Sequence, residues 1–286
     1  TVERVQAMID ALPSAEEITE DNAEDVKAQL EAIDEAKAQL SDEELDALDF
    51  SRYIEAADAL GGLSAPMLTA NGTGEVSTAT ELVAALADDT NETVKLIADV
   101  TIAATLVVNR TVTLDMNGHV LKYENNTNRD SVLMVESGGT LTIADSNTAA
   151  RHKFTPDGNG LWVLDESGGT EEVAGGVITG GTGKPDDRYG DSGGVYVGDN
   201  ASLIMNGGSI VGCKAESGGG VCIVYDYTAQ KTSEFIMKGG SIIGCTASSG
   251  GGVLIRSGCR FTMNSDSEIR CCTAENGGGV TISASP

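Results

Sequence analysis

The first sixty residues place apolar side chains at helical spacing. Apolar positions recur at about i, i+3, i+4 and i+7 in three successive stretches, the first of which stops at Pro13. Capping sequences at Asp21–Glu24 and Ser41–Glu44 open the second and third stretches. The three apolar stripes are Val5, Met8, Ile9 and Leu12; Val26, Leu30, Ile33 and Leu40; and Leu45, Leu48, Tyr53, Ile54 and Leu60. Residues 1–60 therefore predict a small antiparallel three-helix bundle.

The helical pattern then breaks off. Residues 61–76 are rich in glycine, serine, asparagine and proline, and we expect them to form a linker. Thr78–Glu81 is a capping box that opens a short helix, with Leu82, Val83 and Leu86 expected to face inward. A lone helix before a run of strands is expected to cover the open end of a stacked structure.

From Thr93 onward, short alternating β runs are separated by glycine, asparagine and aspartate, and near the C-terminus they repeat. One motif spans Met205–Cys213 and Met237–Cys245, and a variant with one extra residue spans Met263–Cys272; each copy is followed by Gly-Gly-Gly-Val. The leading methionines lie 32 and then 26 residues apart, which indicates a 26-residue unit with optional insertions. Such a unit cannot bury its apolar face alone, so residues 77–286 predict a solenoid of about six stacked parallel β coils that begins with the capping helix.

Alternation along each strand predicts which side chains face the core. Equivalent inward positions should form stacks with the spacing of neighbouring strands, about 4.8 Å. The expected stacks are Leu203/Phe235/Phe261, Met205/Met237/Met263, Ile210/Ile242/Ile269 and Cys213/Cys245/Cys272. Weaker upstream copies match Leu133, Val135, Leu141 and Ile143 to Val195, Val197, Leu203 and Met205, and Val173–Ile178 to Met205–Ile210.

These repeats resemble right-handed parallel β-helix proteins of the pectin-lyase-like superfamily, and more narrowly large adhesin-like surface proteins of Gram-positive gut bacteria. The segments Val112–Leu121 and Gly139–Asp145 match opening coils of that group, and Met8–Pro13 with Ile18–Thr19 resembles the small helical modules found in tandem along such proteins. Together they cover nearly the whole chain. The resemblance implies a mainly β fold and an extracellular location, at the cell surface or secreted, and is much less specific for function.

Composition divides the chain and excludes some partners. The formal charge is −26 with a pI near 4.2, which argues against binding to nucleic acid or to an anionic membrane surface. Residues 1–60 carry −14 of this charge and no glycine, whereas residues 158–286 hold 29 of the 36 glycines. No apolar run is long enough to span a bilayer. The start at Thr1 without a signal core is expected of a processed chain or a fragment, and we expect further C-terminal coils after Pro286.

The cysteines are expected to be structural. Stacked Cys213, Cys245 and Cys272 would have parallel rather than converging Cβ vectors, which favours buried reduced thiols over disulfides. Cys259 aligns with small inward residues. Cys222 is expected on the outer face of a strand and is therefore the candidate reactive thiol.

The solenoid shows little sign of catalytic chemistry. Cleavage of glycans on such a fold needs carboxylates, or a base with a calcium site, on one outer face. The inferred outward rows contain no Asp, Glu, His, Lys or Arg: they are Tyr196, Cys222, Leu254 and Thr281, and Thr142, Ile204, Ile236 and Thr262. His119 and His152 lack the spacing of paired ligands and are expected at the surface or in turns. We expect no cofactor, no metal and no enzymatic activity.

Loops are the remaining candidates for ligand binding, because a solenoid tolerates insertions and holds them rigidly. One corner of the repeat should collect Asn125, Asn126, Arg129, Asp186, Asp187, Arg188, Tyr189 and Asp191. Another should carry the loops Asp165–Glu172 and Tyr225–Ser233, which present Tyr225, Asp226 and Tyr227. Tyrosines beside carboxylates and amides suit the stacking of sugar rings. Solvated loops without a ligand are the alternative, as is calcium held by Asp186, Asp187 and Asp191.

The function expected from the sequence is a non-catalytic cell-surface adhesin or binding scaffold. Its loops would face host or dietary glycans, or a host surface protein. The alternatives are a glycan-cleaving β-helix enzyme, either a polysaccharide lyase or a glycoside hydrolase, and a purely structural spacer.

Overall fold

The structure is a computed structural model, and the chain divides into two compact units, Thr1–Ala65 and Pro66–Pro286. It describes residues 2–14, 17–18, 22–37, 48–49, 51–53, 55–56, 67–69, 72–125, 130–183, 192–224 and 232–283. Within these residues, no helix is long and apolar enough to cross a bilayer.

The N-terminal unit is helical. Helices α1 (Val2–Asp10) and α2 (Ala23–Lys37) bury apolar side chains in one core, joined by short described segments around Leu48 and Ala56. The buried members are Val5, Ile9, Leu12, Ile18, Val26, Leu30, Ile33, Leu48 and Ala56. The first two apolar stripes therefore do form a core, apart from Leu40, which lies outside the described residues. Most of the expected third helix lies outside them too, with helical residues described at 51–53 and 55–56.

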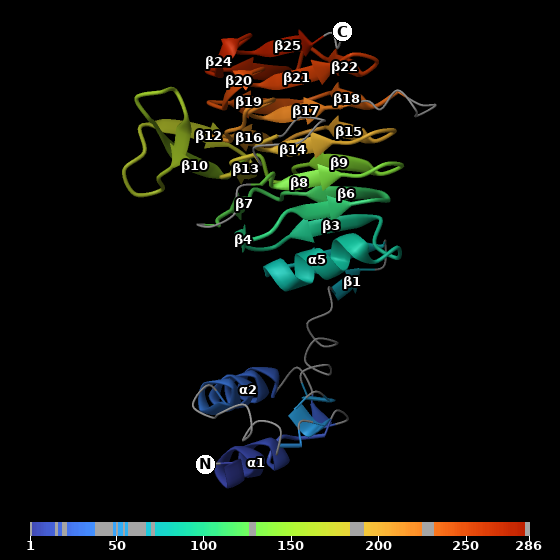
Figure 1. Ribbon diagram of the computed structural model, residues 1–286, viewed down its shortest axis with the longest axis vertical. Coiled ribbons are helices and arrows are strands. Elements are labelled where there is room, and N and C mark those ends of the chain that lie inside the picture. The colour runs from blue at the N-terminus through green and yellow to red at the C-terminus, as the bar shows by residue number, and fades with distance from the viewer. Residues whose placement is uncertain are drawn as a thin grey trace. The chain divides into compact units, whose positions relative to one another are not determined.

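The second unit is a parallel stack of strands (Figure 1). Its strands form three long sheets, numbered 1 to 3 below. From β5 onward, strands of the stack belong in turn to sheet 3, sheet 1 and sheet 2, which is the arrangement of a β-solenoid. Sheet 1 contains β1 (Met67–Thr69), β2 (Thr73–Val76), β3 (Thr93–Leu96), β6 (Thr111–Asp115), β9 (Thr140–Ala144), β15 (Ser202–Met205), β18 (Glu234–Met237) and β22 (Arg260–Met263). Sheet 2 contains β4 (Val100–Ile102), β7 (Val120–Tyr123), β13 (Val177–Thr179), β16 (Ser209–Val211), β19 (Gly240–Ile243) and β23 (Ser267–Arg270). Sheet 3 contains β5 (Leu106–Val108), β8 (Leu133–Val135), β14 (Val195–Val197), β17 (Val221–Ile223), β21 (Val253–Arg256) and β25 (Val280–Ser283).

The strand registers confirm the repeat. Leu203 pairs with Phe235 and Phe235 with Phe261, whose rings stack at a centroid distance of 5.1 Å. The methionine and isoleucine stacks are in the expected register as well, and so are both predicted outward rows. One upstream match is wrong in part. Ile178 does pair with Ile210, but the upstream sheet partner of Met205 is Ile143, because Val173 belongs to an insertion.

Glycines make the tight corners between sheets 2 and 3. Gly218, Gly250 and Gly277 have φ near +65°, which only glycine adopts without strain. At Gly219 a Cβ would collide with the carbonyl oxygen of Gly251 in the next repeat. These glycines therefore let the backbones of successive repeats come into contact.

The capping helix is present as α5 (Ala79–Ala87), with Thr78 and Glu81 forming the predicted capping box. It packs on β2, β3, β4 and β5 at the start of the stack (Figure 1). Leu82 and Leu86 are buried as expected, but Val83 is 56% exposed. Val83 follows Leu82 by about 100° around the helix, so it turns away from the core that Leu82 enters.

The segment expected as a linker also contributes to the stack. Of residues 61–76, strands β1 and β2 join sheet 1, and β2 pairs parallel with β3. Val76 is fully buried in the main core. The segment has the composition of a linker because it is rich in glycine and asparagine. Its β2 backbone nevertheless pairs with β3, which follows α5 in the chain.

Arg110 joins α5 to the first repeats. Its Nε donates to the carbonyl of Leu86 at 2.7 Å, Nη2 to that of Ala85 at 3.1 Å and Nη1 to that of Asn91 at 2.7 Å. These carbonyls lie at and just beyond the C-terminal end of α5, where backbone oxygens lack helical partners. The side chain of Arg110 is only 12% exposed.

We expect Arg110→Lys to destabilise the stack, because one ammonium group cannot reach three carbonyls spread around a planar guanidinium. The expected loss is roughly 2–4 kcal/mol of unfolding free energy, measured by urea denaturation. Arg260→Lys is the control, because the side chain of Arg260 is 69% exposed beside Glu234. Equal stability of the two variants would contradict this role of Arg110.

Candidate functional site

An antiparallel sheet is inserted into the stack between β9 and β13. It consists of β10 (Arg151–Pro156), β11 (Trp162–Leu164) and β12 (Glu171–Ala174), and we call residues 151–174 the β-insert. In Figure 1 it projects from the side of the stack beside β13 and β16. The prediction that Asp165–Glu172 shares a corner with Tyr225–Ser233 is wrong. The β-insert leaves between sheets 1 and 2, whereas residues 225–233 connect β17 of sheet 3 to β18 of sheet 1.

The β-insert packs firmly against the outer face of sheet 2. Phe154, Trp162 and Val173 form a buried cluster with Val177, Val211 and Ile243 of the stack. The backbone N–H of Trp162 donates to the carbonyl of Gly244 at 2.9 Å. The guanidinium carbon of Arg270 lies 5.1 Å from the Trp162 ring centre, in the range of a cation–π contact.

Two corner glycines make room for Trp162. Gly212 and Gly244 follow β16 and β19 with φ of +62° and +57°. A Cβ on Gly212 would overlap the carbonyl of Trp162, and a Cβ on Gly244 would overlap its indole ring. The equivalent position after β23 is Cys271, which keeps a φ of +55° but is exposed. The β-insert therefore docks on a repeated corner position. This position is glycine in the two repeats that Trp162 contacts, and cysteine in the next repeat.

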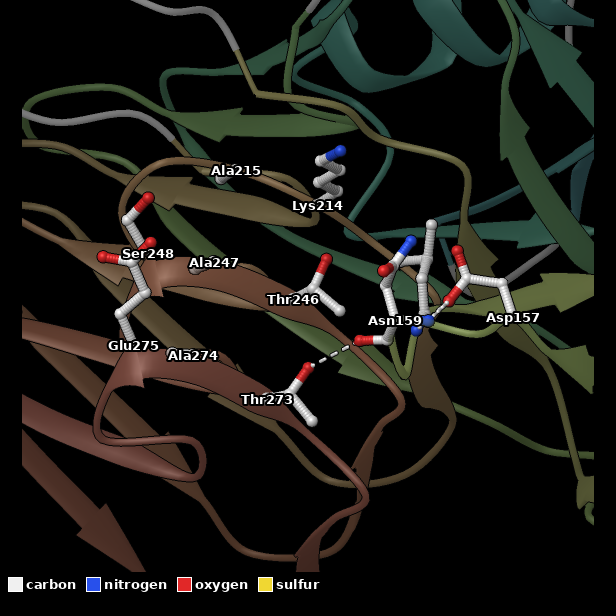
Figure 2. Close-up of a pocket in the computed structure, with 11 residues that line it drawn as sticks. Asp157, Asn159, Lys214, Ala215, Thr246, Ala247, Ser248, Thr273, Ala274 and Glu275 are labelled. Carbon is white, nitrogen blue, oxygen red and sulfur yellow. Dashed lines mark hydrogen bonds between the residues drawn. The ribbon is translucent and has the colours of Figure 1, made fainter.

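A groove lies between the tip of the β-insert and the neighbouring repeats (Figure 2). Its floor includes a small parallel sheet of β20 (Thr246–Ser249) and β24 (Thr273–Asn276), and its wall is the turn 157–161. The volume is about 510 Å³. The lining residues are Asp157, Asn159, Leu161, Lys214, Ala215, Thr246, Ala247, Ser248, Thr273, Ala274 and Glu275.

The wall of the groove has a fixed shape. The Asp157 carboxylate accepts hydrogen bonds from the backbone N–H of Asn159 at 2.7 Å and of Leu161 at 2.9 Å. These donors hold the pKa of Asp157 below its ordinary value, because they stabilise the charged carboxylate. Thr273 ties the wall to the floor by donating through Oγ1 to the carbonyl of Asn159 at 3.3 Å, the contact dashed in Figure 2.

The surface of the groove offers polar contacts around a flat floor. Alanines 215, 247 and 274 leave the floor without bulky side chains, and Thr246, Ser248 and Thr273 supply hydroxyl groups. Lys214 adds an exposed ammonium group, and Glu275 an exposed carboxylate. Over the described parts of the chain, no three His, Cys, Asp or Glu side chains are arranged to hold a metal ion.

Of the single residues named from sequence as ligand-binding candidates, the structure describes Asn125 alone. Its Nδ2 donates to the carbonyl of Ala103 at 2.7 Å, so the side chain holds the corner after β7. The other candidates lie outside the described residues: Asn126, Arg129, Asp186, Asp187, Arg188, Tyr189, Asp191, Tyr225, Asp226 and Tyr227. Sequence reasoning missed the groove, because its wall and floor lie far apart along the chain, with 114 residues between Asn159 and Thr273.

Two expectations about single residues are wrong. Cys222 does face outward from sheet 3, but it is fully buried in a second small cluster with Val224 and Leu254, so it is not an accessible thiol. His152 was expected at the surface or in a turn and is instead 8% exposed on β10. Cys222 is covered by apolar neighbours such as Leu254, and His152 lies between Glu166 and Gly118.

No disulfide joins the six cysteines, all of which lie in described segments. Burial raises the pKa of Cys245 well above its ordinary value and that of Cys259 to about 11. The pKa of Cys272 is raised too, chiefly by its contact with Cys245. The Cys245 and Cys272 thiols are therefore protonated at neutral pH.

We expect Cys271 to react first with a thiol reagent at neutral pH, because it is the exposed cysteine, and Cys222 to react only on unfolding. Stopped-flow absorbance with an aromatic disulfide measures this. Cys271→Ser should remove the fast phase and Cys222→Ser should leave it. A fast phase that survives Cys271→Ser and disappears in Cys222→Ser would show that the face of sheet 3 is open.

Comparisons of the chain with protein-family models, with curated proteins and with solved structures found no match.

Proposed function

We propose that this chain is part of an extracellular, non-catalytic adhesin or binding scaffold. In this proposal the stack is a right-handed parallel β-helix of the pectin-lyase-like type, of the kind seen in surface proteins of Gram-positive gut bacteria. The sequence repeats and the acidic composition support this proposal. The groove beside the β-insert is its ligand site.

The observation that carries the proposal is the preformed wall of the groove. Trp162 seats the β-insert on Gly212 and Gly244, and Asp157 and Thr273 fix the turn that overhangs β20 and β24. A concave site of about 510 Å³ lies within the range of roughly 300–1,000 Å³ of small-ligand sites. A site that is rigid before binding loses little entropy when it is filled.

The chemistry of the lining favours a glycan over a protein surface. Hydroxyl, ammonium and carboxylate groups pair with the many hydroxyls of a sugar, and the flat alanine floor can accept an apolar sugar face. Protein ligands bind through larger and flatter contact areas, of about 800 Å² on each partner.

The residues that line the groove give less support to the alternative of a glycan-cleaving enzyme. Hydrolysis uses two carboxyl groups, one of them protonated to act as the acid. Asp157 is used by its own turn and its pKa is lowered, which is the wrong direction for a general acid. That leaves Glu275 as the one uncommitted carboxylate among the described lining residues.

The experiment is a glycan array of mucin, host and plant-cell-wall sugars, followed by calorimetry of each hit. Ala247→Arg should fill the groove and weaken binding at least tenfold, about 1.4 kcal/mol. Thr262→Arg, at an exposed outward position on β22, is the control and should bind like the wild type.

Three other results lead elsewhere. Loss of binding in Tyr225→Ala/Tyr227→Ala, with Ala247→Arg unaffected, would keep the adhesin and move its site to that loop. Release of new reducing or unsaturated ends would make the protein an enzyme. Failure to bind any glycan, together with failure to bind host surface proteins, would leave the structural spacer.

A further inference from the structure

His152 faces two hydrogen-bond acceptors at once. Its Nδ1 lies 2.8 Å from Oε1 of Glu166, and its Nε2 lies 2.9 Å from the carbonyl oxygen of Gly118. The side chain is only 10% exposed, while that of Glu166 is 50% exposed. Glu166 uses its other oxygen to accept the backbone N–H of Lys153 at 3.2 Å.

These two contacts need the charged form of the ring. Neutral imidazole has one N–H donor and one lone pair, whereas imidazolium has two donors. A carbonyl oxygen and a carboxylate only accept. A neutral ring that donates to Gly118 would turn its lone pair toward the Glu166 carboxylate, and a ring that donates to Glu166 would turn it toward the Gly118 carbonyl.

The contacts join the β-insert to the stack. His152 lies on β10, Glu166 lies in the turn between β11 and β12, and Gly118 lies in the connection from β6 to β7. Gly118 is itself fixed, because its N–H donates to Oδ1 of Asp145 at 2.7 Å. The β-insert is thus attached at one place by Trp162 and at another by His152.

We infer that His152 is a pH-sensitive latch for the β-insert. When the ring is charged, both contacts hold the insert against the stack. When the ring loses its proton as pH rises, one contact is lost and the insert loosens, together with the turn 157–161 that walls the groove. The latch itself does not depend on the proposed function; its effect on ligand binding does.

Other charged groups near the latch act on the same ring. Glu166 is in contact with it, and Asp145 lies behind Gly118; both favour the imidazolium. Along β10 and β12, Arg151 pairs with Glu172 at 3.3 Å, and Lys153 adds a positive charge. On the stack, His119 contacts Asp99 at 3.2 Å through Nδ1.

His119 provides a matched control. A neutral ring satisfies its contact with Asp99 by donating from Nδ1, so the geometry does not require the charged form. The chain has two histidines and one tryptophan, and that tryptophan lies in the β-insert. The fluorescence of Trp162 therefore reports the docking of the insert directly.

The test compares the full chain with His152→Gln, Glu166→Gln and His119→Gln between about pH 5 and pH 8, where imidazole changes charge. The readouts are acrylamide quenching of Trp162 and hydrogen exchange of the β10–β12 amides, corrected for intrinsic rates. In the wild type and in His119→Gln, quenching should fall and protection should rise as the pH is lowered. At the lower pH, His152→Gln and Glu166→Gln should exchange at least tenfold faster than the wild type, about 1.4 kcal/mol. At the higher pH they should match it.

A purely structural role would make these variants faster by the same factor at both pH values, and that result would overturn the latch. A wild-type insert whose docking does not change with pH would overturn it as well. If His152→Gln does not fold, Glu166→Gln carries the test, because half of that side chain is already in solvent. None of the readouts uses a ligand, so failure of the latch and failure of the groove as a binding site are separate results.

Discussion

The structure depends on the stacking of identical backbone positions from one repeat to the next. Strands of successive repeats pair in parallel and in register, so that Val221 lies beside Val253 and Val253 beside Val280. The spacing of paired strands, about 4.8 Å, then applies to the corners as well as to the sheets. At the corners there is no room for a side chain, and the glycines at 219 and 251 let the carbonyl of the next repeat take that place. Core packing of the phenylalanine and methionine stacks follows from the same register.

The corner glycines also shape the outside of the stack. Because Gly212 and Gly244 have no Cβ, their backbone is uncovered at the edge of sheet 2, and Trp162 packs directly against it. An insertion seated there becomes a wall, and the flat alanines of the neighbouring repeats become a floor. The groove thus forms from two repeated features, the corner glycines and the alanines at equivalent positions, together with the β-insert, which is not repeated.

Much of the fold could be predicted from the sequence because the constraint is repetitive. The register of the inward stacks and outward rows and the capping box at Thr78 all follow from local spacing and are confirmed. The β-insert could not be predicted in this way. Polar and apolar residues alternate along its strands as they do in the repeat. From sequence, Val173 is therefore assigned to the stack, although its strand partner is His152 of the β-insert. The groove needs contacts such as that of Thr273 with Asn159, which no local pattern contains.

The account rests most heavily on the seat of Trp162 on the glycine corner. The direct measurement is the fluorescence of this single tryptophan in Gly244→Ala and Gly138→Ala. Both glycines have a left-handed φ, so both variants carry backbone strain of about 1–2 kcal/mol, but a Cβ at Gly138 meets nothing within 4 Å. We predict that Gly244→Ala shifts the emission to the red and increases quenching, while Gly138→Ala leaves both unchanged. Unchanged emission in folded Gly244→Ala would show that Trp162 does not lie on this corner, and would contradict the account of the groove.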